Sequence, residues 1–143
     1  MFNPSRDQAR QFLFDAWQKT LEHRPLTPLE DMASRIIADH PEYQALLENR
    51  ERHAERDYRP EDGETNPFLH ISLHLSIREQ VSIDQPPGIR ALHQQFCVHT
   101  GSAHAAEHEI MDGLMEMLWQ AQRHGTPPDP AIYFACLRQK LQR

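Results

Sequence analysis

Two pairs of histidines with identical spacing are the residues of this sequence best suited to chemistry. His70 and His74 form one pair, and His104 and His108 form the other. On an α-helix, residues four apart lie one turn above each other on the same face, so both imidazoles of a pair can reach one ion or two adjacent ions. Random placement of 10 histidines in 143 residues would give about 0.7 such pairs. The number of pairs is therefore weak evidence for a functional site, and the residues that surround the pairs are more informative.

Both pairs lie on apolar stripes of the helices that we expect to contain them. Leu73, Ile77 and Val81 accompany the first pair, and Met111 and Met115 accompany the second. A polar group buried without a partner costs about 1–3 kcal/mol, so imidazoles facing inward need ligands or hydrogen bonds. Coordination of a metal ion would satisfy all four. Hydrogen bonds to carbonyl or carboxylate groups are the alternative for each histidine taken singly.

Four further residues could complete a coordination sphere. Glu107 lies beside His108 and Asp112 lies one turn beyond it, so each could be a ligand or could orient an imidazole. The helix dipole stabilises an acid in a first turn without any metal, which is the alternative for Glu107. His40 and His93 adjoin apolar stripes of other predicted helices. Each of these two could instead be a capping or core histidine.

The ligand types restrict the metal and the chemistry. Imidazoles with a minority of carboxylates suit zinc, iron, nickel or copper and disfavour calcium or magnesium. We expect a mono- or dinuclear transition-metal site, with iron or zinc favoured. The sequence lacks the Glu-x-x-His element of ferritin-like proteins and the His-Glu-x-x-His motif of zinc proteases. By analogy of architecture the site is hemerythrin-like, and metal-dependent hydrolysis or oxygen and peroxide chemistry are the available reactions.

A metal-free protein is the second interpretation of the same residues. In that case the chain is a structural or protein-interaction module whose core histidines are held by hydrogen bonds. Arg78, Glu79 and Gln80 form a polar cluster directly after the first histidine pair. An ion pair with another helix is favoured over a substrate contact for this cluster. Whether the protein is an enzyme, and on what small molecule it would act, stays open at this point.

The elements that must position these histidines are all predicted to be helices. Apolar residues recur at helical spacing, and the segments begin and end at caps, prolines and glycines. The fold expected is an all-α, compact bundle of about six or seven helices in a single domain, 1–143, with one long loop at about 58–65. The predicted helices cover residues 5–24, 27–40, 41–49, 66–84, 88–99, 103–125 and 129–141.

Composition and charge exclude several partners. The net charge is −6, and basic residues are interleaved with acids, so a nucleic-acid-binding surface is not expected. The chain has no run near the roughly 18 apolar residues of a membrane span, and its first ten residues lack a signal-peptide core. We therefore expect a cytoplasmic protein that does not contact membranes. A homodimer is compatible with these features.

Three segments resemble a known family. They are HPEY (40–43), NPFLHISLHLSIREQ (66–80) and HAAEHEIMDGLMEMLWQAQR (104–123). The chain resembles, over nearly its whole length, a small bacterial family known as domain of unknown function 1841, which has no assigned activity. The resemblance implies a bacterial cytosolic protein. Relatives often carry a histidine where Gln44 stands here, so the resemblance does not imply a ligand at this position.

Overall fold

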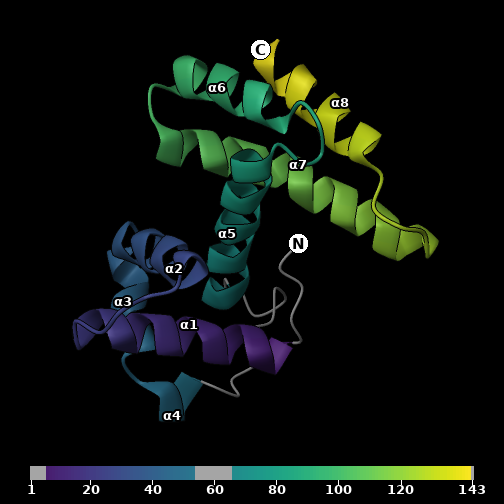
Figure 1. Ribbon diagram of the computed structural model, residues 1–143. Coiled ribbons are helices and arrows are strands. Elements are labelled where there is room, and N and C mark those ends of the chain that lie inside the picture. The colour runs from purple at the N-terminus through teal and green to yellow at the C-terminus, as the bar shows by residue number, and fades with distance from the viewer. Residues whose placement is uncertain (1–5, 54–65, 143) are drawn as a thin grey trace. The chain divides into compact units, whose positions relative to one another are not determined.

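The described chain consists of helices joined by short turns, as predicted. A computed structural model describes residues 6–53 and 66–142, and these ranges contain no strand. Seven of their helical segments have at least seven residues, and the eighth, α4, has four. The predicted helix start at Ser5 and the predicted loop at about 58–65 lie outside the described residues. The helices are α1 (Arg6–Leu21), α2 (Pro28–Ala38), α3 (Pro41–Leu47), α4 (Arg50–His53), α5 (Pro67–Ile83), α6 (Ile89–Thr100), α7 (Ala103–His124) and α8 (Pro130–Leu141) (Figure 1).

Local capping interactions set several of these boundaries. At the start of α2, Thr27 Oγ1 accepts a hydrogen bond from the backbone N–H of Glu30, and the Glu30 carboxylate accepts one from the N–H of Thr27. Asn66 Oδ1 accepts from two backbone N–H groups of α5, and Asp129 caps α8. Gly125 ends α7 at a φ of 63°, a conformation that glycine adopts readily. These caps confirm the predicted starts of α2, α5 and α8 and the predicted end of α7.

The chain falls into two compact units, residues 1–75 and 76–143, and the division lies within α5. Each unit has its own apolar core, so each is described separately. The expectation of a single domain stays a prediction. No helix within residues 6–53 and 66–142 combines the length and the apolar content that crossing a membrane requires.

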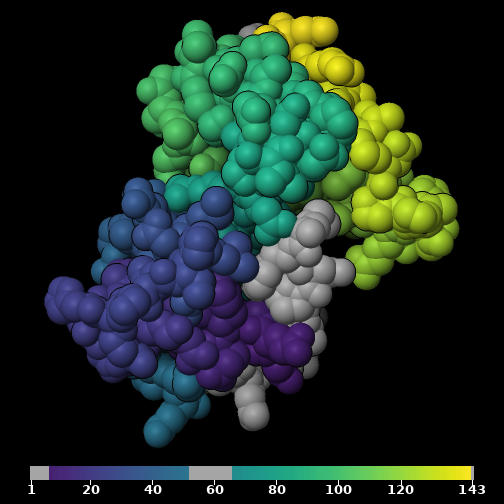
Figure 2. Space-filling model, in the orientation of Figure 1, coloured from purple at the N-terminus to yellow at the C-terminus, as the bar shows by residue number. Residues whose placement is uncertain are grey.

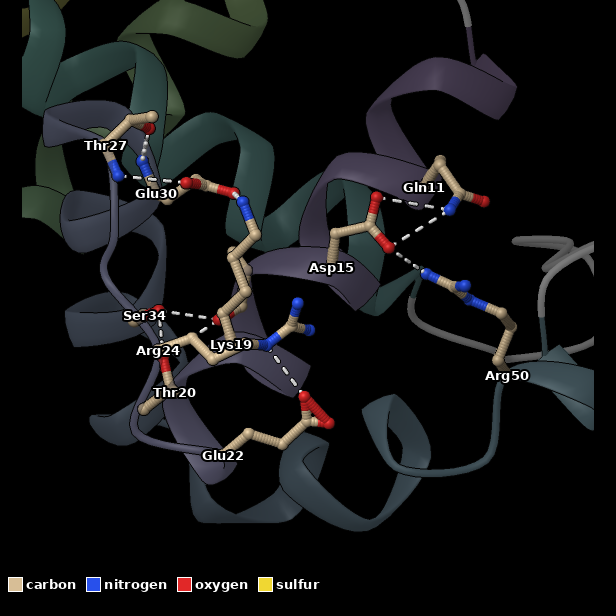
Figure 3. Close-up of polar contacts among 11 residues, drawn as sticks. Gln11, Asp15, Lys19, Thr20, Glu22, Arg24, Thr27, Glu30, Ser34 and Arg50 are labelled. Atoms are coloured by element: carbon tan, nitrogen blue, oxygen red, sulfur yellow. Dashed lines mark hydrogen bonds and ion pairs between the residues drawn. The ribbon is translucent and has the colours of Figure 1, made fainter.

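In the first unit, α1 packs against α2 and α3. Its core is apolar and includes the first part of α5. A polar layer joins α1 to α2: Lys19 Nζ lies 2.8 Å from a carboxylate oxygen of Glu30, and the hydroxyls of Thr20 and Ser34 lie 2.6 Å apart (Figure 3). The hydrogen bond from Lys19 is the main reason that the pKa of Glu30 is lowered. The core residues include Leu13, Phe14, Ala16, Trp17, Ala33, Ile36, Ile37, Leu47, Phe68, Ile71 and Leu75.

In the second unit, α7 packs against both α6 and α8. The space-filling view shows α6 and α8 next to each other on one face of this unit (Figure 2). Gly113 lets α8 approach α7 closely, because a Cβ atom at this position would lie 2.7 Å from Cδ2 of the buried Leu137. The hydroxyl of the buried Tyr133 donates a hydrogen bond to Gln80, at 2.8 Å. Gly113 and the hydrogen bond between Tyr133 and Gln80 therefore contribute to helix packing in this unit.

Candidate metal centre

His40 is held at the junction of α2 and α3, where the chain turns. It follows the last turn of α2 and is the residue before Pro41, the first residue of α3. Its ring nitrogen Nδ1 lies 2.7 Å from the carbonyl oxygen of Ile36. A carbonyl oxygen only accepts, so Nδ1 carries the proton. In the neutral ring this leaves the lone pair on Nε2, the arrangement that metal-binding histidines use.

Two histidines of α5 lie against this nitrogen. His70 Nε2 lies 3.2 Å from His40 Nε2, and His74 Nε2 lies 3.2 Å from His70 Nε2. The three rings are inclined to one another by 58–79°, with centroids 4.7–5.0 Å apart. His40 and His74 are buried and His70 is half-buried. The first unit thus gathers three imidazoles, the histidine triad His40, His70 and His74.

The central ring of the triad, His70, has two close nitrogen neighbours at a single ring atom. An imidazole nitrogen has a single in-plane direction, which holds either a proton or a lone pair. Nε2 of His70 has two ring nitrogens at the same distance of 3.2 Å. One proton or one lone pair on His70 Nε2 can serve only one of them with good geometry.

The spacing of the triad does match that of ligands around one ion. Zinc–nitrogen bonds of 2.0–2.1 Å in tetrahedral geometry place ligand nitrogens about 3.3 Å apart. The two nitrogen–nitrogen distances here are 3.2 Å, and one ring nitrogen of each histidine lies within 4.8 Å of the other two. The triad could therefore hold a single transition-metal ion.

Tyr43 covers the triad from α3. Its ring stacks on His40 at 5.5 Å between centroids, with an angle of 9° between the planes, and meets His70 edge-on at 5.9 Å. Burial, with a smaller contribution from Glu42, raises the pKa of the Tyr43 phenol. The phenol is therefore neutral near pH 7, and its aromatic face shields one side of the triad.

The other predicted histidine pair belongs to the second unit. His104 and His108 lie on the first turns of α7, with ring centroids 4.4 Å apart and planes at 82°. Both residues are half-buried. The helical spacing therefore places these two imidazoles side by side, as the sequence predicted. Their role as ligands stays a prediction.

The two predicted carboxylate ligands each contact a basic residue within the second unit. Both oxygens of the buried Glu107 lie 3.1 Å from Nε of Arg78, which confirms the interhelical ion pair expected for Arg78. Asp112 is exposed and accepts a hydrogen bond of 2.8 Å from Lys140, which also binds Glu109. Burial lowers the pKa of Lys140, but the hydrogen bonds and negative charges of Asp112 and Glu109 together outweigh burial and raise it. A ligand role for either acid stays a prediction and would have to compete with these contacts.

His93 has a different neighbour. Its ring nitrogens lie 3.8 Å from the sulfur of Cys97, one turn later on α6. Burial, and to a smaller extent the charge of Glu107, raises the pKa of the Cys97 thiol. A thiol held in its protonated form is a poor nucleophile and a poor ligand. His93 and Cys97 therefore do not form an activated pair, and a metal role for His93 stays a prediction.

Part of this arrangement could be predicted from the sequence, and part could not. The spacing of His70 and His74 was informative because both residues lie on one helix. His40 was only a secondary candidate, since its neighbours Ile36 and Ile37 are as typical of a core or capping histidine. The contact of Tyr43 with the triad was not predicted. The only signal in the sequence is the nearness of Tyr43 to His40 within HPEY, which fixes no contact by itself.

The fold and the triad define an all-α protein with a histidine cluster that could bind a transition metal. Residues 5–139 match the family described as domain of unknown function (DUF1841), and the chain belongs to this family. No curated protein matches the chain, and no solved structure does. The family description assigns no activity, so a functional conclusion depends on the site itself.

Proposed function

We propose that this protein binds a transition-metal ion through Nε2 of His40, His70 and His74. The observation that carries the proposal is the convergence of three Nε2 atoms, with two separations of 3.2 Å. The hydrogen bond from His40 Nδ1 to the Ile36 carbonyl supports it, because such a bond fixes the tautomer and the ring orientation of a ligand. Burial of His40 and His74 supports it further, since water competes less for a metal ion at a buried site.

The donor set suits a transition metal, and zinc or iron is the ion proposed. Neutral imidazoles suit zinc, iron, nickel and copper, and the triad contributes nitrogen donors alone. The distances support a mononuclear site, because the three nitrogens lie close to one another rather than in two groups. Binding requires deprotonated ring nitrogens, so metal affinity falls as the pH is lowered.

Three protein ligands leave a coordination position for a fourth ligand, water or a substrate. A zinc or iron ion with an open position supplies Lewis acidity or, for iron, redox chemistry. Hydrolysis and oxygen or peroxide chemistry are thus the reactions that the proposal admits, as in the hemerythrin-like analogy. The predictions that His104, His108, Glu107, Asp112 or His93 contribute a further ligand belong to this proposal and are tested by the same measurements.

Metal analysis of the full chain, purified without an affinity tag, tests the proposal. We expect about one equivalent of zinc or iron after loading, and a rise in Tm that a chelator reverses. His40→Ala should abolish both effects. The matched control is His124→Ala, because His124 is an exposed histidine at the end of α7. Less than about 0.2 equivalents of any transition metal, with no change in Tm on loading, would refute the proposal.

A metal-free structural role is the second candidate, and the contacts among the triad favour it specifically. The contacts of His70 Nε2 with His40 and His74, one of them as a well-formed hydrogen bond, could stabilise the first unit without an ion. In that case His40→Ala lowers the Tm to the same extent with and without chelator. In the metal-binding case the loss of Tm is larger in the metal-loaded protein and disappears when chelator is added to both proteins.

A further inference from the structure

The outer face of α7 presents large apolar side chains to solvent. Met115, Leu118 and Trp119 are 47%, 39% and 50% exposed, respectively. They lie within five residues of one another on one side of the helix, and we call them the α7 apolar stripe. The sequence groups them with Ile110, Met111 and Leu114 on a single wide apolar face, but the structure buries only these last three. The packing of α6 and α8 therefore leaves part of this face uncovered.

Single exposed apolar residues are common on protein surfaces, but this stripe is contiguous and contains tryptophan. Methionine, tryptophan and arginine are enriched in the buried centres of protein interfaces. Arg123 lies beside the stripe, with its guanidinium carbon 5.0 Å from the centre of the Trp119 ring. The ring and the cation are thus held together before any partner binds, which reduces the entropy lost on association.

The charges beside the stripe show which partner fits it. Glu116 and Arg123 are seven residues apart, so they lie on the same side of α7, about two turns from each other. Trp119 lies between them along the helix. When two copies of α7 run antiparallel and cross near Trp119, Glu116 of each copy falls opposite Arg123 of the other. Leu118 and Trp119 of each copy then lie near their counterparts at the crossing point, Met115 lies further along the partner's α7, and both pairs of opposite charges are formed by one two-fold operation.

We propose that two copies of this chain associate through antiparallel packing of α7, with Leu118 and Trp119 of the α7 apolar stripe at the centre and Glu116–Arg123 pairs beside them. Self-complementary charge is the specific reason to choose a second copy over an unrelated protein. A different partner would need its own acid and base at the matching spacing. None of the three histidines of the proposed metal site takes part, so dimerisation and metal binding can be tested independently.

Sedimentation velocity of the full chain over a range of concentrations tests this proposal. We expect a species of twice the chain mass of 16.7 kDa, and we expect Trp119→Glu to shift it to the monomer at the same concentrations. The matched control is Val98→Glu, an equivalent change on α6 at a residue that is 86% exposed and outside the stripe. A wild-type monomer throughout, or a dimer that persists in Trp119→Glu, would overturn the proposal.

A charge exchange tests the antiparallel arrangement itself. Glu116→Arg and Arg123→Glu each place like charges at both edges of the dimer and should each weaken it, by about 10-fold in Kd. The double variant restores opposite charges and should recover most of the affinity, although a glutamate at position 123 would not replace the contact of arginine with Trp119. Circular dichroism of each variant monitors the fold. Double-variant affinity no better than that of the single variants would contradict the antiparallel packing.

Discussion

The α5 and α7 helices carry the same histidine spacing, but the histidines of the two helices have different neighbours within their units. On α5, His74 and His70 have Nε2 atoms 3.2 Å apart, and His40 of the same unit adds a third at 3.2 Å from His70. On α7, His104 and His108 lie side by side with ring centroids 4.4 Å apart, next to the buried ion pair of Glu107.

This difference shows what helical spacing can and cannot achieve. A separation of four residues brings two imidazoles to one face, and this holds for both helices. A site for an ion needs a further donor from elsewhere, oriented by a contact that fixes its tautomer. In the first unit, His40 at the junction of α2 and α3 supplies both the third donor and the contact that fixes its tautomer. The predictions below test this distinction.

The largest effect should come from removing a histidine of α5. We expect His74→Ala to raise the Kd for zinc by at least about 100-fold, because loss of outer-shell partners alone costs 10- to 100-fold in metal affinity. Competition with a chromophoric chelator measures this Kd. His104→Ala is the corresponding change on α7 and should have a smaller effect. An equal loss in both variants would show that the two pairs serve the same ion.

A substitution on α7 should affect the stability of the second unit but not the triad. Gly113→Val places side-chain atoms against Leu137 and Tyr133, whose nearest atoms lie 2.7 Å and 3.2 Å from a Cβ at residue 113. We expect a loss of about 2 kcal/mol in the free energy of unfolding, measured in urea. Ala91→Val on the exposed side of α6 is the control. A Gly113→Val protein as stable as this control would contradict the close packing of α7 and α8.

The shielding of the triad predicts a smaller effect at Tyr43. Tyr43→Leu removes the ring stacked on His40 and should raise the Kd for zinc by up to about 10-fold, or about 1.4 kcal/mol. Tyr43→Phe keeps the ring and should change the Kd less than about 2-fold, as expected from preserved stacking. Isothermal titration calorimetry of both variants with zinc separates the contribution of the ring to the Kd from that of the hydroxyl. If Tyr43→Phe loses as much affinity as Tyr43→Leu, the hydroxyl is the important group.

The smallest effect concerns the pH dependence of the first unit. The pKa of Glu30 is lowered, chiefly by Lys19, from its usual value of 4.5. Stability from this interaction is complete above pH 4.5 and is lost as the pH falls through the lowered pKa. Denaturant titrations between about pH 6 and pH 3 should show an acid-dependent loss that is smaller in Lys19→Met, by up to about 1 kcal/mol. If the free energy of unfolding changes equally with pH in the wild type and in Lys19→Met, the Lys19–Glu30 pair makes no such contribution.

Much of the helical architecture could be predicted from local chemistry. Thr27 with Pro28 and Glu30 sets the start of α2, and Asn66 and Asp129 cap α5 and α8. These signals are local, because a cap involves residues within three or four positions of one another. Contacts between polar side chains that are far apart in the sequence could not be predicted in this way. The bond from Tyr133 to Gln80 spans 53 residues and depends on the packing of helices around it.

The amino-acid sequence by itself determined that His70 and His74 share a helix face, because the period of the α-helix fixes that relation. It also determined the all-α class, through apolar periodicity and helix caps. Only the tertiary structure decided that His40 joins the α5 pair, since the packing of the first unit brings together residues 30 positions apart. It likewise decided that Glu107 pairs with Arg78 and that the α7 apolar stripe stays uncovered. Periodicity assigns a residue to a face, but packing decides what that face meets.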